Sequence, residues 1–274
     1  MAKQLYDYWF VQFDFPNEEG KPYKSSGGKM VWNETLKREI PEGWEVTRLD
    51  EMTSSVNGGE WGEDACSDKS PVEIHCLRGA DFKDTYKAPT RYISPKKKSK
   101  CLSEFDLVVE ISGGSPTQAT GRSVFITKEL LDFYDGKLTC TNFCQSVSFD
   151  GKQLAIYFNY VWNMFYENDI MFNFEGKTSG LKNLQMDVIL KEQWYVPSGN
   201  LLERFHNEVL PMLQTIEKNK QQNNSLADQR DSLLPLLMNG QVEVSDVEKD
   251  MLMAAEPVAE YEVTRHANSD LSHG

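Results

Sequence analysis

A long helical stretch towards the C-terminal end is the strongest constraint on this chain. Residues 199–240 follow the turn-forming run Pro197-Ser198-Gly199-Asn200 and close at Asn239-Gly240, residue types that commonly end helices. Pro211 predicts a kink or the start of a second helix. From Pro211 to Leu236, about 26 residues would extend roughly 40 Å at 1.5 Å per residue. A domain of this size seldom needs so long a helix, so the stretch predicts packing against a partner helix.

Side chains at steps of three and four residues define the contact face of this stretch. Such spacing places them on one side of a helix, as in coiled-coil-like pairs. The predicted interface residues are Leu213, Ile216, Asn223, Leu226, Arg230, Leu233 and Leu237.

The remaining patterns predict an α+β fold, in which one mixed α/β domain precedes the long helix. Turn-forming clusters separate short β-rich runs, and residues 153–167 have the length and apolarity of a buried helix. Near the start, Leu5, Trp9 and Phe13 recur every four residues and predict a short helix ending near Phe13. The predicted strands are 72–77, 106–111, 123–127, 145–149 and 193–196. The predicted segments are 1–39 (a helix end and linker), 40–198 (the mixed domain), 199–240 (the long helix) and 241–274 (a tail).

The distribution of charge is more informative than its total. The 274 residues carry a net charge of −13, which argues against a protein that coats itself in positive charge to bind nucleic acid non-specifically. Residues 241–274 hold two basic and eight acidic side chains, a net charge of −6, and predict an acidic tail outside the packed core. The sign reverses in residues 69–100, where nine Lys or Arg face three Asp or Glu, net +6.

Other patterns concern the cellular setting. No apolar run approaches 18 residues and the first residues lack a basic segment followed by an apolar one, so neither a membrane span nor a secretory signal is expected. Five cysteines without a CxxC pair indicate reduced thiols that act mostly as small core residues. We therefore expect a cytoplasmic protein.

Recognisable catalytic patterns are missing from the sequence. The glycines at 113, 114 and 121 have the wrong spacing for a phosphate loop, and no GxGxxG motif is present. Cys66, His75, Cys76 and Cys101 match no structural zinc pattern, so no metal site is expected. Glu104, Asp106 and Glu110 lack the lysine that a nuclease cluster would need, and Glu110 is interpreted as a surface residue at a strand end. No catalytic residue is therefore predicted.

Basic and polar side chains instead suit DNA binding. Lysines neutralise phosphates, whereas Arg can pair with guanine and Asn or Gln with adenine. The alternative is that the basic stretch is only a solvated loop and the glycines only shape turns. The predicted DNA-binding residues of the basic stretch are Lys69, Arg78, Lys83, Lys87, Arg91, Lys96, Lys97, Lys98 and Lys100. Those of the polar loops are Gly113, Gly114, Gln118, Arg122, Asn142, Gln145, Lys177, Thr178, Ser179, Lys182 and Asn183.

Several separate motifs, in order, carry a resemblance to a known family. They are residues 5–49, which include IPEGW at 40–44; LRGADF at 77–82; the glycine-containing stretch 112–122; TSGLKNL at 178–184; and RDSLLP at 230–235 with the following Asn239-Gly240. Together they resemble the DNA-specificity (S) subunit of type I restriction-modification systems, in a form with a single target-recognition domain. The resemblance covers about residues 1–240.

The resemblance implies a non-catalytic subunit. In that family, each target-recognition domain reads one half of a bipartite DNA target, and antiparallel spacer helices dock two methyltransferase (M) subunits. No cofactor is expected on this chain, because S-adenosylmethionine binds the methyltransferase. A restriction motor (R) subunit can join the complex. One recognition domain where a full subunit has two implies a homodimer and a palindromic interrupted site.

The alternative hypothesis is a silent or recombining specificity-gene fragment, which acts only as a protein-interaction module without DNA binding. The target sequence and the spacer length are not encoded in any recognisable motif.

Overall fold

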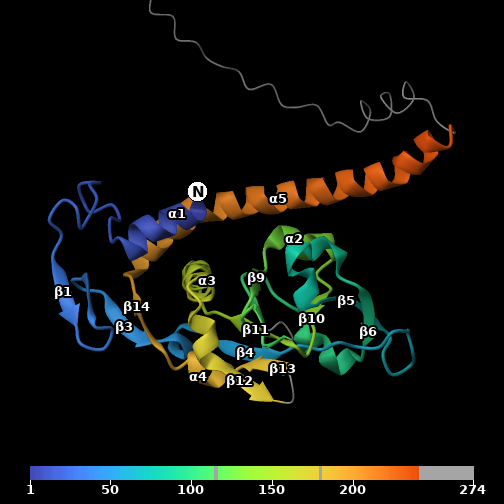
Figure 1. The fold of residues 1–274 in the computed structure, drawn as a ribbon, viewed down its shortest axis with the longest axis horizontal. Helices are drawn as coiled ribbons and strands as arrows, with labels where there is room; N and C mark the ends of the chain where they lie inside the picture. The colour runs from blue at the N-terminus through green and yellow to red at the C-terminus, as the bar shows by residue number, and fades with distance from the viewer. Residues whose placement is uncertain (114–116, 179–180, 241–274) are drawn as a thin grey trace, which may run out of the picture. The chain divides into compact units, whose positions relative to one another are not determined.

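The computed structural model describes residues 1–113, 117–178 and 181–240 (Figure 1). It divides into two compact units, residues 1–221 and residues 222–274, and the second is described up to Gly240. Short strands and helices make up the first unit, so the predicted α+β class is confirmed.

Four-stranded and three-stranded sheets form the frame of the first unit. The largest has the order β4-β11-β7-β9, with every neighbouring pair antiparallel. In the sheet β10-β5-β6, β10 runs parallel to β5, while β12-β13-β8 is antiparallel. Their strands are β4 (Ser55–Gly58), β5 (Val72–Leu77), β6 (Thr90–Ile93), β7 (Leu107–Glu110), β8 (Ser112–Gly113), β9 (Ser123–Phe125), β10 (Leu138–Cys140), β11 (Cys144–Ser148), β12 (Glu175–Thr178) and β13 (Leu181–Leu184).

Two further antiparallel strand pairs are formed by residues nearer the two ends of this unit's sequence. β1 (Met30–Asn33) pairs with β2 (Arg38–Pro41), and β3 (Glu45–Arg48) pairs with β14 (Gln193–Val196). Helices α1 (Ala2–Tyr6), α2 (Lys128–Phe133), α3 (Lys152–Glu167) and α4 (Met186–Ile189) complete it with the start of α5 (Gly199–Met238). The five predicted strands and the predicted buried helix are all present, with ends that differ by at most two residues.

Aromatic rings join the N-terminal helix to the rest of the core. α1 lies beside the first turns of α5 (Figure 1), where the Phe10 ring packs against Phe205 with centroids 4.8 Å apart. The Tyr195 hydroxyl donates to the Phe10 carbonyl at 2.6 Å, and the Tyr157 hydroxyl donates to the Tyr195 carbonyl at 2.7 Å. Segments from both ends of the unit therefore share one core.

The first helix ends earlier than the sequence predicts. After α1 the chain makes one π-helical turn, Asp7–Val11, with the Gln12 amide bonded to the Asp7 carbonyl. Phe13 then adopts a left-handed φ of 66° outside the helix. The wider i→i+5 turn rotates the apolar face, so Tyr6 and Phe10 are buried along with Trp9 and Phe13.

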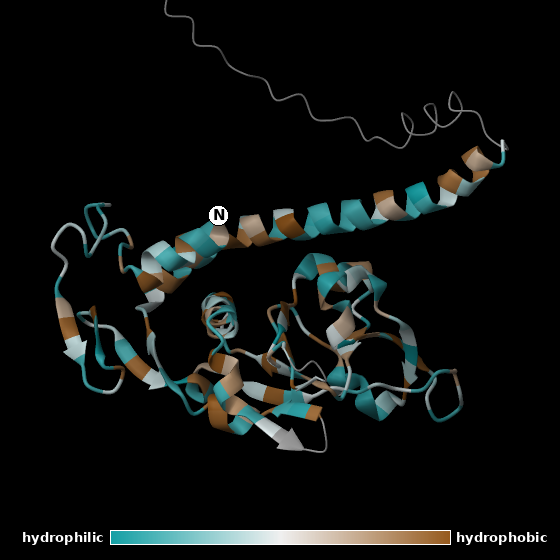
Figure 2. Cartoon of the chain, in the orientation of Figure 1, coloured by the Kyte–Doolittle hydropathy of each residue, from teal (hydrophilic) through white to brown (hydrophobic). Residues whose placement is uncertain are grey.

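The long helix α5 is continuous from Gly199 to Met238, so the predicted second helix at Pro211 is absent. Proline removes one backbone hydrogen bond of a helix. Pro211 itself is exposed. Apolar residues on either side of it hold the helix in place, because Val209 is fully buried and Leu213 packs against the core. Hydrophobic bands alternate with hydrophilic ones along α5 in Figure 2.

Candidate nucleic-acid interface

The loop that follows β4 lies directly against the turn between β10 and β11. The Gly59 amide donates to the Cys144 carbonyl at 3.1 Å, and the Glu60 amide donates to the Cys140 carbonyl at 2.7 Å. A Cβ atom on Gly59 would lie 2.1 Å from the Thr141 carbonyl oxygen. Glycine is required there because the two backbones approach too closely for any side chain.

Part of the basic stretch reaches the same loop. Lys97 and Lys100 belong to the 3₁₀ turn Pro95–Lys100. The Lys97 ammonium lies 2.8 Å from a Glu60 carboxylate oxygen, and the Lys100 ammonium donates to the Gly58 carbonyl at 2.9 Å. The structure therefore places these two predicted site residues beside the turn that carries Asn142.

Other cations of the basic stretch are partly neutralised by nearby acids. Arg78 forms a two-pronged pair with Asp81, at 2.9 Å from Nε and 2.7 Å from Nη2, and this hydrogen bonding raises the pKa of Arg78. Lys87 lies 3.0 Å from Asp84. Within the described part of the chain, the exposed lysines without an ion-pair partner in this stretch are Lys69, Lys83, Lys96 and Lys98.

Arg91 is built into the fold and is not available to a phosphate in this structure. Its side chain is 7% exposed and ion-paired with Asp64. Nε donates to the Trp61 carbonyl at 3.2 Å and Nη2 to the Gly62 carbonyl at 3.0 Å, while the guanidinium lies 4.1 Å from the Trp61 ring centroid. Arg91 therefore positions Trp61, through one hydrogen bond to its carbonyl and a cation–π contact with its ring.

A cavity of about 310 Å³ lies where these elements meet. The turn Thr141–Cys144, closed by the Cys144 amide on the Thr141 carbonyl at 2.9 Å, places Asn142 and the 53% exposed Phe143 at its edge. The cavity combines aromatic walls with polar groups, as ligand sites commonly do. Its lining residues are Trp61, Arg78, Gly79, Ala80, Glu110, Ser112, Thr141, Asn142 and Phe143.

Glu110 is buried, so its interpretation as a surface residue is wrong. The Arg122 guanidinium donates to both carboxylate oxygens, at 2.7 Å from Nε and 2.7 Å from Nη2, and this pairing raises the pKa of Arg122. The pair packs against Gly79, where a Cβ atom would lie 2.1 Å from Glu110 Oε1. A buried carboxylate needs such a partner, because an unpaired charge in the interior is very costly.

The glycine-containing loop and the later polar loop meet in the sheet β12-β13-β8. Gly113 pairs with Lys182, and Ser112, which also lines the cavity, pairs with Asn183. The Lys182 ammonium lies 3.1 Å from Glu175 and 4.8 Å from the Phe172 ring centroid. The predicted polar segments that contain Gly113, Asn142 and Lys182 therefore converge on one region of the first unit.

The other predicted polar residues differ in their surroundings. Gln118 donates to the Tyr166 hydroxyl at 3.1 Å. Gln145 lies within β11, between β4 and β7, and its Oε1 is buried, so it is poorly placed to reach a base. Gly114 and Ser179 lie outside the described residues, and Lys177 and Thr178 are described only as backbone of β12.

The helix residues predicted as an interface fall in both units. Leu213 packs against the core of the first unit, and Ile216 is 45% exposed. In the second unit, Leu226 is 58% exposed. Asn223 and Arg230 are also exposed there, and Leu233 and Leu237 are half-buried. Pairing of this face with another helix stays a prediction.

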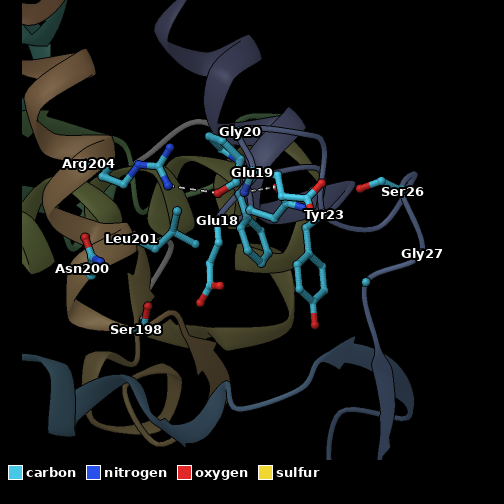
Figure 3. A pocket seen from close by; sticks show the side chains of 14 residues that line it. Glu18, Glu19, Gly20, Tyr23, Ser26, Gly27, Ser198, Asn200, Leu201 and Arg204 are labelled. Atoms are coloured by element: carbon cyan, nitrogen blue, oxygen red, sulfur yellow. Dashed lines mark hydrogen bonds between the residues drawn. The ribbon is translucent and has the colours of Figure 1, made fainter.

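A second cavity, of about 870 Å³, holds none of the predicted site residues (Figure 3). It lies between the loop that contains Glu18 and Tyr23 and the start of α5. There the Arg204 guanidinium donates to the Pro16 carbonyl at 3.0 Å. This contact fixes the linker against α5.

The described residues form neither a metal-binding cluster nor a membrane-spanning helix. Among the described residues, no group of three or more His, Cys, Asp or Glu side chains is arranged to hold a metal ion. No helix in that part of the chain is long and apolar enough to cross a membrane.

Comparison with known proteins identifies a relative with a stated role. Over 258 residues the chain is 27% identical to the type I restriction enzyme MjaIX specificity subunit of Methanocaldococcus jannaschii. The match covers 90% of this chain. This chain is therefore similar to a type I restriction enzyme specificity subunit. It spans about half the length of that relative, 53%.

The other comparisons add less. No protein-family model matches the chain. Among solved structures, the type I restriction-modification S subunit of M. genitalium has a TM-score of 0.45 and 13% identity, covering 70% of this chain and 43% of that one. The HsdS subunit of Thermoanaerobacter tengcongensis has a TM-score of 0.40 and 10% identity, covering 72% and 48%. Both scores lie below 0.5, so the stated relationship depends on the sequence match.

Three residues of the cavity of about 310 Å³ were not predicted from the sequence. Trp61 and Phe143 line it beside predicted residues, and Glu110 lies buried at its edge. Phe143 could have been found from its position between Asn142 and Gln145 in a polar turn. The burial of Glu110 could not, because its partner Arg122 is 12 residues away.

Proposed function

We propose that this chain is a non-catalytic subunit that recognises a DNA sequence for a type I restriction-modification methyltransferase. The observation that carries the proposal is the match to a specificity subunit along 90% of the chain. The converging polar loops and the exposed lysines of residues 69–100 support a DNA-binding role.

In this proposal the chain reads one half of a bipartite double-stranded target. It docks methyltransferase subunits through its helices, and these supply S-adenosylmethionine and the catalytic residues. A restriction motor subunit joins the same assembly. Two copies related by a twofold axis would supply both halves of the target.

Co-expression with a type I methyltransferase subunit, followed by mapping of methylated adenines, tests the proposal. The expected result is a co-purifying complex and one interrupted, palindromic methylation motif. A complex that forms without sequence-specific methylation would favour the protein-interaction alternative. Absence of both a complex and a motif would contradict the proposal.

The exposed lysines allow a second test in the same system. Lys96→Glu combined with Lys98→Glu should weaken DNA binding for all sequences alike and lower the salt slope of binding, by about 0.9 per lost phosphate contact. Lys191→Glu, another exposed lysine outside the predicted site, is the matched control. An unchanged salt slope in the double variant would show that this segment does not contact phosphates.

A further inference from the structure

The cavity between Trp61 and Phe143 has a hydrogen-bonding character that suggests what it recognises. Two guanidinium groups lie at it, and both are already engaged: Arg78 with Asp81, and Arg122 with Glu110. Arg is the residue that most often reads guanine, through O6 and N7. With both groups held by carboxylates, this cavity is poorly suited to guanine.

The hydrogen-bonding groups that remain include acceptors and one amide. Each carboxylate oxygen of Glu110 accepts a single bond from Arg122, which leaves further lone pairs for a donor. Asn142 is exposed at the edge of the cavity and carries both an acceptor and a donor. An Asn side chain matches N6 and N7 of adenine bidentately.

The aromatic walls give this edge a defined shape. Trp61 is held from one side by the Arg91 guanidinium, and its own loop is bonded to the Cys140 carbonyl through Glu60. The Phe143 carbonyl accepts the Ile111 amide at 2.9 Å, which fixes the turn while the ring stays 53% exposed. A held Trp61 side chain and a fixed backbone turn at Phe143 suit recognition, because less conformational entropy is lost on binding.

We infer that this cavity is a base-reading subsite for adenine, with Asn142 as the residue that determines the specificity and Phe143 as its apolar wall. The inference rests on the proposed function and names the base that one part of the recognition surface selects. Glu110 acts as a positioning residue, which shapes the floor of the cavity together with Arg122 and Gly79.

Selection of binding sites from a random-sequence duplex library by the full-length chain, in complex with its methyltransferase subunit, tests the inference. The wild type should enrich one motif with an A·T pair at the position read by Asn142. Asn142→Ala and Phe143→Ala should lose the preference at that position alone. Trp32→Ala is the matched control, because Trp32 is also 53% exposed but does not line the cavity, and its motif should be unchanged.

A chemical substitution in the DNA keeps the test independent of protein folding. Replacing that adenine by purine, which lacks the N6 amino group but keeps N7, removes one of the two hydrogen bonds and should weaken wild-type binding several-fold, by less than the roughly 5- to 150-fold expected for loss of a whole bidentate base contact. The same replacement should have little effect on Asn142→Ala.

The outcomes distinguish failure of the proposed function from failure of the adenine-subsite inference alone. If the wild type enriches no motif, the proposed function fails and this inference fails with it. If the wild type enriches a motif that neither variant alters, or if the altered position is a G·C pair, the inference alone is overturned. An unchanged affinity for the purine-containing site would also overturn it.

Discussion

Tyr86 and Glu217 lie 131 residues apart in the sequence and meet inside the first unit. The Tyr86 hydroxyl lies 3.2 Å from both the carbonyl and a carboxylate oxygen of Glu217, whose other carboxylate oxygen is 2.6 Å from the Lys220 ammonium. Both Tyr86 and Glu217 are buried. This contact holds the last turns of α5 that belong to the first unit against the basic stretch.

Removing the Tyr86 hydroxyl should therefore destabilise the first unit. Tyr86→Phe leaves a buried carboxylate with one fewer donor, and we expect a loss of about 1–2 kcal/mol in the free energy of unfolding, measured by urea denaturation. Tyr8→Phe, at a 38% exposed ring, is the control and should change stability little. Equal effects of the two substitutions would contradict this role.

The ion pair of Glu110 and Arg122 should be worth more than a surface pair. Glu110→Ala leaves a half-buried guanidinium without its partner, and we expect destabilisation of about 3 kcal/mol, the lower end of the range for breaking a buried pair. A double-mutant cycle with Arg122→Ala isolates the coupling. Additive effects of the two substitutions would mean that the pair contributes no interaction energy.

Gly59 and Gly79 should not tolerate a methyl group. Either alanine places a Cβ atom 2.1 Å from an oxygen, so we expect a loss of about 1–3 kcal/mol from overpacking, measured by thermal unfolding. Gly58→Ala is the control, since no atom lies within 4 Å of its added Cβ. If Gly59→Ala is as stable as Gly58→Ala, the close approach of the two backbones is not maintained in solution.

Asp106 should give stability a specific pH dependence. Burial raises its pKa above the usual 3.8, although the Ser103 amide and the Ser148 hydroxyl donate to it. A raised folded-state pKa contributes stability below the unfolded-state value and loses that contribution as pH rises through the folded-state value. Relative to Asp106→Asn, the wild type should therefore lose stability as pH rises above about 4, measured by chemical denaturation. A difference that stays constant with pH would contradict the burial of an ionisable carboxyl group.

The cysteines should differ strongly in reactivity with a thiol reagent. Burial raises the pKa of Cys144 to about 11 and that of Cys76 to about 12, whereas Cys66 is exposed. Because the thiolate is the reactive form, we expect iodoacetamide at pH 8 to modify Cys66 first and the buried thiols only after unfolding. Cys66→Ser should remove the fast phase when labelling is followed by mass spectrometry. Rapid labelling of Cys144 in the folded protein would show that β11 opens readily.

Much of the fold follows from local patterns in the sequence. The run 72–77 becomes β5 without any change of its ends, and the apolar residues 153–167 become the buried helix α3. These patterns are reliable because period and apolarity act within a few residues of each other. Pro211 shows where the local rule fails, since packing of Val209 and Leu213 against the core outweighs the missing hydrogen bond.

The candidate site depended on the sequence for its residue types and on three-dimensional packing for its arrangement. Composition and order were enough to select the basic stretch and the polar loops, because charge and hydrogen-bonding capacity belong to each residue. Which cations are exposed depends on distant partners. Asp64 and Trp61 enclose Arg91, and Glu110 engages Arg122, through contacts between segments that meet only when the sheets assemble. Those contacts bury Arg91 and Glu110, and no pattern along the chain encodes that burial.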